Sequence, residues 1–143
     1  MSIIERIQRT YSQLNAETVT TGLLSELYDD NILFIDPLHR IEGLPALQSY
    51  FEGMYRNVID IRFDYLNTWD QDGEAMLRWQ MDFRHPKLKN GSSIILPGAT
   101  FLQYKDKVTL HQDYFDSNQM IFDHAPVLGS VLGWLKNRLN RTE

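Results

Sequence analysis

The chain has 143 residues, no cysteine, a formal net charge of -5 and a pI near 5.3. This length fits one domain with a substantial core, so we expect a single domain over residues 1–143. The lack of cysteine excludes disulfides, thiolate metal sites and cysteine nucleophiles, and the acidic balance argues against a nucleic-acid-binding groove.

The first third of the chain predicts three helices and one strand. Apolar residues recur at helical spacing after Ser2, which forms a capping-box pattern with Glu5 and so predicts an amphipathic first helix. A second helix is expected from about Glu17 to Tyr28, with Asn15 as a possible cap. The strand "NILFID" follows and ends at a proline, and "EGLPALQSYFEGMY" predicts the third helix.

Beyond this helix the apolar period changes from about 3.6 to about 2, which indicates strands. The strands "DIRFDYLNTWD" and "EAMLRWQMDFRH" flank a turn at Gly73. The next strand, "SSIILPGATFLQY", contains Pro97 and Gly98, which suggest a bulge or bend, and "VTLHQDYFD" is the last strand. Helical spacing then predicts a helix from Pro126 to Leu139.

These elements predict an α+β fold in which a curved antiparallel sheet wraps around the long first helix as a cone with one open end. Their order, with the segments "LYDDNILFIDPLHRIEGLPALQSYF" and "VTLHQDYFDSNQMIFDHAPVLGSVLGWLKNRL", resembles the SnoaL-like or nuclear transport factor two-like superfamily. The resemblance covers nearly the whole chain and implies a cystatin-like cone. It is specific for fold rather than activity, because this superfold carries isomerases, cyclases, epoxide hydrolases, dehydratases and binding domains.

Three positions are similar to ketosteroid isomerase, a member of that superfamily. Asp36 in "IDP" matches its general-base aspartate, Tyr11 stands where it keeps an oxyanion-hole tyrosine, and Phe115 matches an aromatic residue of the pocket wall. Thr100 departs from the pattern, because it falls near a protonated aspartate and can supply only a hydroxyl. The residues alone also allow a simple Asx turn at Asp36 and a core position for Tyr11.

The orientation of the last strand is open. SnoaL-type cyclases use an aspartate with a histidine, and if Phe115 faces a cavity, strand alternation brings Asp113 and His111 to the same side. Asp116 would then lie on the other face. The opposite orientation would bury the more apolar face of the strand, which carries Val108, Leu110 and Tyr114.

We expect a small hydrophobic cavity lined by Leu77, Trp79, Met81, Phe83, Thr100 and Phe115. The resemblance implies a cofactor-independent isomerase or cyclase that moves a proton on a small hydrophobic carbonyl compound. Asp36 would be the base, Tyr11 the donor to an oxyanion, and Asp113 with His111 auxiliary groups. The alternative is a non-catalytic ligand-binding or protein-interaction module. No metal is expected, because "HQD" supplies at most two ligands.

We further expect a homodimer through the outer face of the sheet. That face would combine apolar residues of the last strand with the polar side chains of Arg62, Arg78, Gln80, Asp82 and Arg84. The first residues lack the apolar run of a secretory signal, and no segment approaches the ~20 apolar residues of a membrane span. The expectation is a cytoplasmic protein that binds neither membranes nor nucleic acid.

Overall fold

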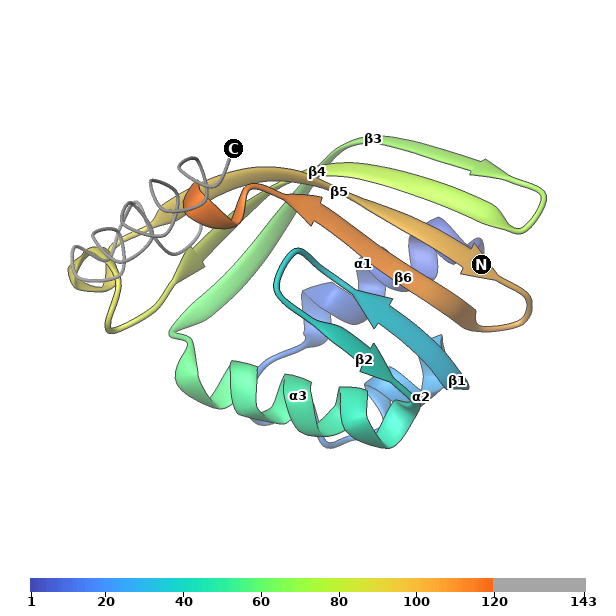
Figure 1. Cartoon of the computed structure of the whole chain (residues 1–143), viewed down its shortest axis with the longest axis horizontal. Helices are drawn as coiled ribbons and strands as arrows, with labels where there is room; N and C mark the ends of the chain where they lie inside the picture. The colour runs from blue at the N-terminus through green and yellow to red at the C-terminus, as the bar shows by residue number, and fades with distance from the viewer. Residues whose placement is uncertain (120–143) are drawn as a thin grey trace, which may run out of the picture.

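The computed structural model of the chain describes residues 1–119 and confirms the expected α+β architecture. Six strands form one curved sheet in the order β2-β1-β6-β5-β4-β3. Figure 1 shows this sheet bent over helix α1, with helix α3 beside β1 and β2. The expected carboxy-terminal helix, Pro126 to Leu139, lies outside the described residues.

Helix α1 spans Ile3–Gln13 and begins as its sequence predicts. The Ser2 hydroxyl accepts a hydrogen bond from the backbone N–H of Glu5 at 3.1 Å, which satisfies one of the free donors of the first turn. Ile3 and Ile7 on its inner face are buried against the sheet. The helix therefore gives the sheet a fixed surface to curve around.

Helix α2 spans only Leu23–Leu27, which is much shorter than expected. The Asn15 side chain accepts from the backbone N–H groups of Glu17 and Thr18, so it closes a local turn instead of starting a long helix. Gly22, with φ of 90°, then adopts a left-handed backbone conformation, so the helix can begin only after it. Because α2 ends at Leu27, Tyr28 becomes the first residue of a strand.

The remaining elements follow the predicted order with one addition. Strand β2, Arg40–Glu42, was not predicted because three residues are too few to show a period. The other bounds are β1 Tyr28–Ile35, α3 Leu44–Asn57, β3 Asp60–Gln71, β4 Glu74–Arg84, a short 3₁₀ turn Lys89–Gly91, β5 Ile94–Tyr104 and β6 Val108–Phe115.

The sheet is mixed, whereas the sequence predicted antiparallel pairing throughout. Strands β3 to β6 form the expected antiparallel meander. The meander returns the chain beside β1 in the same direction, so β1 and β6 pair in parallel, with Phe34 opposite His111. This pair brings the amino-terminal third of the chain next to the last described strand.

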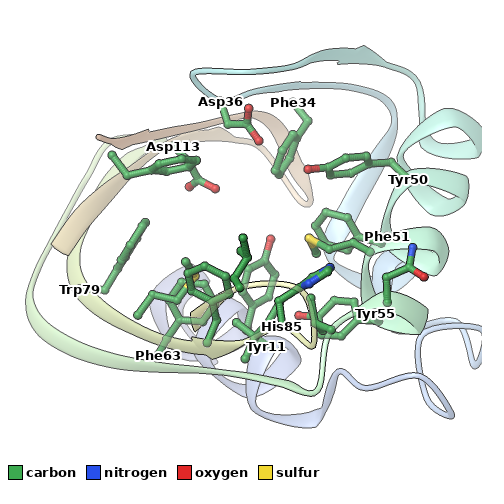
Figure 2. A pocket seen from close by; sticks show the side chains of 18 of the residues that line it. Tyr11, Phe34, Asp36, Tyr50, Phe51, Tyr55, Phe63, Trp79, His85 and Asp113 are labelled. Atoms are coloured by element: carbon green, nitrogen blue, oxygen red, sulfur yellow. The ribbon is translucent and has the colours of Figure 1, made fainter. Parts of the chain in front are cut away.

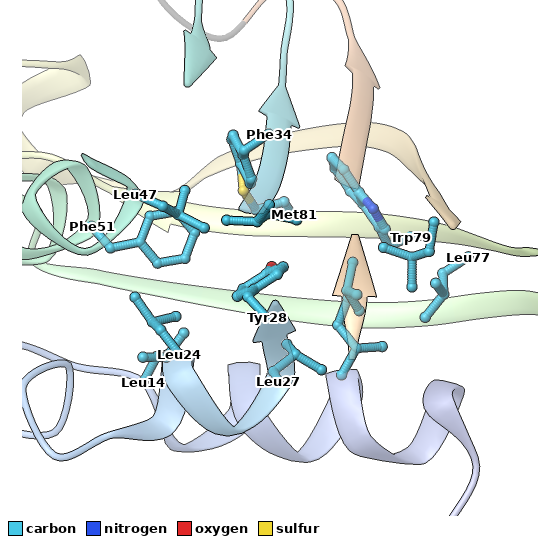
Figure 3. Close-up of a cluster of buried hydrophobic side chains, with 14 of the residues drawn as sticks. Leu14, Leu24, Leu27, Tyr28, Phe34, Leu47, Phe51, Leu77, Trp79 and Met81 are labelled. Carbon is cyan, nitrogen blue, oxygen red and sulfur yellow. The ribbon is translucent and has the colours of Figure 1, made fainter. Parts of the chain in front are cut away.

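Of the bulge or bend expected at Pro97 and Gly98, the bulge is absent, because the β4–β5 ladder runs through both residues without a register shift. The core lies between the concave face of the sheet and the helices. Figure 3 shows leucines of the helical layer facing the aromatic and apolar side chains of the sheet and α3. Labelled members of this core include Leu24, Leu27, Phe34, Phe51, Leu77 and Trp79.

Candidate functional site

A cavity of about 450 Å³ opens on the concave side of the sheet, between α1, α3 and the strands. Its walls are largely aromatic and apolar, and two carboxylates, Asp36 and Asp113, stand among them (Figure 2). Four of the expected wall residues line it, namely Trp79, Met81, Phe83 and Phe115. An enclosure of this size and composition is typical of small-molecule sites.

Leu77 and Thr100 were also expected in the wall, and neither lines the cavity. Leu77 is fully buried in the core, one inward position beyond Trp79 on β4. Thr100 is its cross-strand partner on β5 and is buried as well. The sequence gives the face of a strand correctly, but it does not indicate where along that face the core ends and the cavity begins.

The structure settles the orientation of β6. Asp113 and Phe115 line the cavity and His111 is buried beneath them, while Tyr114 is 52% exposed on the outer face. Asp116 is exposed. Val108 is nevertheless buried, because β6 carries one extra residue, Thr109, between the pairs Gln103↔Leu110 and Tyr104↔Val108.

A chain of hydrogen bonds supports Asp113. The indole Nε1 of Trp79 donates to the Thr100 hydroxyl at 2.8 Å, and that hydroxyl donates to Asp113 Oδ1 at 2.6 Å. His111 Nε2 lies 2.8 Å from the same oxygen. No hydrogen-bond partner for Asp113 Oδ2 is found within residues 1–119, and Figure 2 shows the carboxylate directed into the cavity.

The chain continues from the other nitrogen of His111. The Tyr28 hydroxyl lies 2.8 Å from His111 Nδ1 and 2.5 Å from the hydroxyl of Tyr11, which lines the cavity. The ring of Phe34 stacks on the imidazole, with centroids 4.6 Å apart. Tyr11 and Asp113, two walls of one cavity, are therefore joined through two fully buried residues, Tyr28 and His111.

The tyrosines at this site are held in their neutral form. Burial raises the pKa of Tyr11 and that of Tyr28 well above the usual value, and the negative charge of Asp113 adds to both shifts. Burial also raises the pKa of Tyr50, and Asp36 and Asp113 raise it further. At neutral pH these groups are therefore hydrogen-bonding phenols and not anions.

We expect the buried tyrosines to ionise at a higher pH in the folded protein than in the unfolded protein. Because their pKa values are raised in the folded state, these tyrosines contribute to the free energy of unfolding in full below the unfolded pKa of about 10. That contribution is lost as pH rises above this value towards the folded pKa. Ultraviolet absorbance of tyrosinate, followed against pH in native and urea-unfolded protein, should show later ionisation in the native sample. Coincident curves would contradict the burial of these hydroxyls.

Asp36 is both a turn residue and a cavity residue. Its Oδ1 accepts from the backbone N–H groups of Leu38 and His39, each at 2.8 Å, which makes an Asx turn that includes Pro37. Its side chain is only 8% exposed and lines the cavity. Tyr11 faces the same cavity, but its hydroxyl bonds to Tyr28 and not to Asp36.

Two further residues of the site were not predicted as such. Tyr28 was assigned to a helix, although Ile32 and Phe34 share its buried side of β1. Tyr50 was assigned to the apolar stripe of α3, and its hydroxyl lies 3.4 Å from His39 Nδ1, which in turn lies 3.1 Å from Asp36 Oδ1. The alternation of Ile32 and Phe34 does not continue back to Tyr28, because Asp30 is exposed and the β1–β6 register shifts between Tyr28 and Leu33, so no simple pattern would have identified it.

The part of the chain that the structure describes contains no group of three or more His, Asp or Glu side chains that could hold a metal ion. It also contains no helix long and apolar enough to cross a membrane.

The family model for the SnoaL-like domain matches residues 7–111. This range includes Tyr11, Tyr28, Asp36 and His111 and ends two residues before Asp113. No curated protein matches the chain.

Several solved structures share the fold. A candidate SnoaL-like polyketide cyclase from Shewanella putrefaciens CN-32 is 18% identical with a TM-score of 0.68, over 84% of this chain and 94% of that one. A protein with a ketosteroid isomerase-like fold from Catenulispora acidiphila, in complex with trimethylamine, is 11% identical with a TM-score of 0.72. The match covers 87% of this chain and 92% of that one. An LEH-like epoxide hydrolase from M. tuberculosis is 14% identical with a TM-score of 0.68, and the match covers 82% of this chain and 85% of that one. At these identities the likeness establishes the fold alone.

Proposed function

This chain belongs to the SnoaL-like domain family, and we propose that it is a cofactor-independent enzyme of the isomerase or cyclase kind. It moves a proton on a small hydrophobic carbonyl compound held in the cavity. The observation that supports this most is the state of Asp113, whose Oδ1 is fixed by Thr100 and His111 while Oδ2 faces an apolar space. A carboxylate fixed in this way is a positioned general base.

The base in this proposal is Asp113 and not Asp36. Oδ1 of Asp36 already accepts from two backbone N–H groups, and the His39 ring nitrogen lies 3.1 Å and 3.3 Å from its two oxygens. Asp113 has both its known donors on one oxygen, so the other can take a proton from a carbon next to a carbonyl group. Asp36 then serves to hold the turn at the cavity mouth.

One remaining polar group suits an oxygen that gains negative charge. The phenol of Tyr50 lines the cavity, and burial raises its pKa and keeps it neutral. Neutral hydroxyl groups in an apolar enclosure stabilise an enolate more strongly than they would in water, because little solvent competes for the same bonds. A volume of about 450 Å³ suits a compound of about two fused rings.

The test is hydrogen exchange at carbon. The protein is mixed with 2-tetralone, an enolisable two-ring ketone, in deuterated buffer, and loss of the α-proton signals is followed by NMR. We expect faster exchange than in buffer alone. Saturable binding of 2-tetralone without faster exchange would instead favour the alternative function, a non-catalytic ligand-binding module with the same fold.

We also propose a homodimer through the outer face of the sheet. Ile95 and Tyr114, both about half exposed, lie on that face, and Ile95 is the cross-strand partner of Asp82. Exposed apolar side chains among charged ones suit a moderately wet interface. Light scattering at micromolar concentration should give twice the monomer mass of 16.8 kDa.

The variant Tyr114→Asp should return the protein to the monomer mass. Leu38→Asp is the matched control, because Leu38 is also exposed but lies in the turn between β1 and β2. A monomer mass for the unmodified protein would refute the dimer.

A further inference from the structure

Six residues form one hydrogen-bond chain, Trp79–Thr100–Asp113–His111–Tyr28–Tyr11, which ends at the cavity. The donor and the acceptor of each bond in it can be assigned. We infer that this chain makes the Tyr11 hydroxyl a hydrogen-bond acceptor toward the cavity, so that the preferred ligand carries a hydroxyl group at this position. The inference rests on the proposed function only in that the cavity binds a small hydrophobic ligand. At the Tyr11 position the ligand would carry the hydroxyl of an enol, a phenol or an alcohol, while the carbonyl group of the proposed substrate would lie elsewhere in the cavity.

The direction is fixed first at the Trp79 end. An indole N–H can only donate, so the Thr100 oxygen accepts from Trp79 at 2.8 Å. The hydroxyl hydrogen of Thr100 is then free to point along its other short contact, to Asp113 Oδ1 at 2.6 Å. An ionised carboxylate can only accept, so both neighbours of this oxygen must be donors.

The second donor to Asp113 is His111, and this sets its tautomer. Its Nε2, 2.8 Å from Oδ1, must carry a hydrogen, and in the neutral imidazole Nδ1 is then an acceptor. The Tyr28 hydroxyl, 2.8 Å from Nδ1, therefore donates to it. Since Tyr28 has one hydroxyl hydrogen, its oxygen accepts from Tyr11 at 2.5 Å.

Tyr11 also has one hydroxyl hydrogen, and it is used inside the protein. What the Tyr11 oxygen offers to the cavity is a lone pair, which a ligand hydroxyl can meet as a donor. A carbonyl or ether oxygen would face that lone pair without a hydrogen between them, and such a contact is unfavourable when buried. The cavity thus distinguishes two ligands of the same skeleton by their hydrogen-bonding group.

Reversing the chain requires one more proton on the Asp113–His111 pair, so that His111 Nδ1 carries a hydrogen. That Nδ1–H would donate to Tyr28, Tyr28 to Tyr11, and Tyr11 to a ligand oxygen. The titratable groups that face His111 are Asp113 on its own strand, Tyr28 from β1 and Tyr11 from α1, and Phe34 covers one face of the ring. Binding of a ligand with a carbonyl oxygen at Tyr11 should therefore be accompanied by uptake of a proton by the protein, whereas binding of a ligand with a hydroxyl there should not.

Two naphthalene probes test the inference. At neutral pH, 2-naphthol is a neutral hydrogen-bond donor, and 2-methoxynaphthalene can only accept. We expect 2-naphthol to bind the unmodified protein about tenfold more tightly, the effect of one buried hydrogen bond. In Tyr28→Phe the Tyr11 hydrogen loses its internal acceptor and can turn to the ligand, so the preference should shift about tenfold toward 2-methoxynaphthalene.

Tyr104→Phe is the control, because the Tyr104 hydroxyl bonds to Asp70 and Tyr104 does not line the cavity. It should leave the preference unchanged. Nitrogen-15 NMR of the unmodified protein provides a second measurement that needs no variant, and it should show the Nε2–H tautomer at His111.

Each contrary outcome has a distinct meaning. Equal binding of the two probes with no shift in Tyr28→Phe, or an Nδ1–H tautomer at His111, would overturn the inference and leave the proposed function standing. Failure of both probes to bind would overturn the proposed function, and the hydroxyl preference would fall with it.

Discussion

Asp113→Asn is expected to slow α-proton exchange of 2-tetralone by about 10²–10⁴-fold, the usual contribution of a positioned general base. The amide has nearly the shape of the carboxylate, and its oxygen can still accept from Thr100 and His111. An amide cannot take a proton from carbon at neutral pH. The variant should therefore bind the ketone while losing the chemistry, which exchange and binding isotherms measure separately.

Asp116→Asn is the matched control. Asp116 lies three residues further along the chain, is exposed, and accepts only from the backbone N–H of Asn118 among the described residues. This variant should keep full exchange activity. If Asp36→Asn abolishes exchange while Asp113→Asn retains it, the base is Asp36 and our assignment is wrong.

Gly98→Ala is expected to destabilise the fold by about 1–3 kcal/mol, the usual cost of forcing an extra methyl group into a packed core. A Cβ at Gly98 would overlap the six-membered ring of Trp79, with Cζ3 only 2.6 Å away. The indole has little room to move, because it is almost fully buried and its Nε1 is bonded to Thr100. Urea unfolding measures the loss.

Gly53→Ala on helix α3 is the control for this substitution. The nearest atom to a Cβ there is the end of the flexible Arg56 side chain at 3.8 Å. Alanine should stabilise this helix by about 0.5–1 kcal/mol, because glycine loses more backbone freedom on folding. A Gly98→Ala protein as stable as the unmodified one would show that Trp79 is not held in place as described.

Local patterns in the sequence were sufficient to predict most of the fold. The cap at Ser2 and the alternation along β4 depend on neighbours in the chain, and both are confirmed. The parallel pairing of β1 with β6 depends on where distant segments meet, and no local period encodes it. The shortness of α2 was in principle visible, since Thr18 and Gly22 weaken a helix.

The site was less accessible to such reasoning. A single alternation along β6 cannot account for its burial, because the extra residue Thr109 shifts the faces of the residues before it. Pro97 and Gly98 were taken as signs of a bulge or bend, whereas the lack of a side chain at Gly98 makes room for Trp79. Thr100 was placed at the ligand, and instead it supports Asp113 from within the core.

The parallel pair β1–β6 also has a consequence for how the chain folds. Tyr28 and His111 are separated by 83 positions, so their contact closes a very long loop, and contacts of this kind slow folding. On the ribosome the helices emerge well before β6 exists, and the polar wall of the cavity stays unformed until synthesis has passed residue 113. A ligand that requires the finished wall should therefore slow unfolding while leaving the folding rate unchanged.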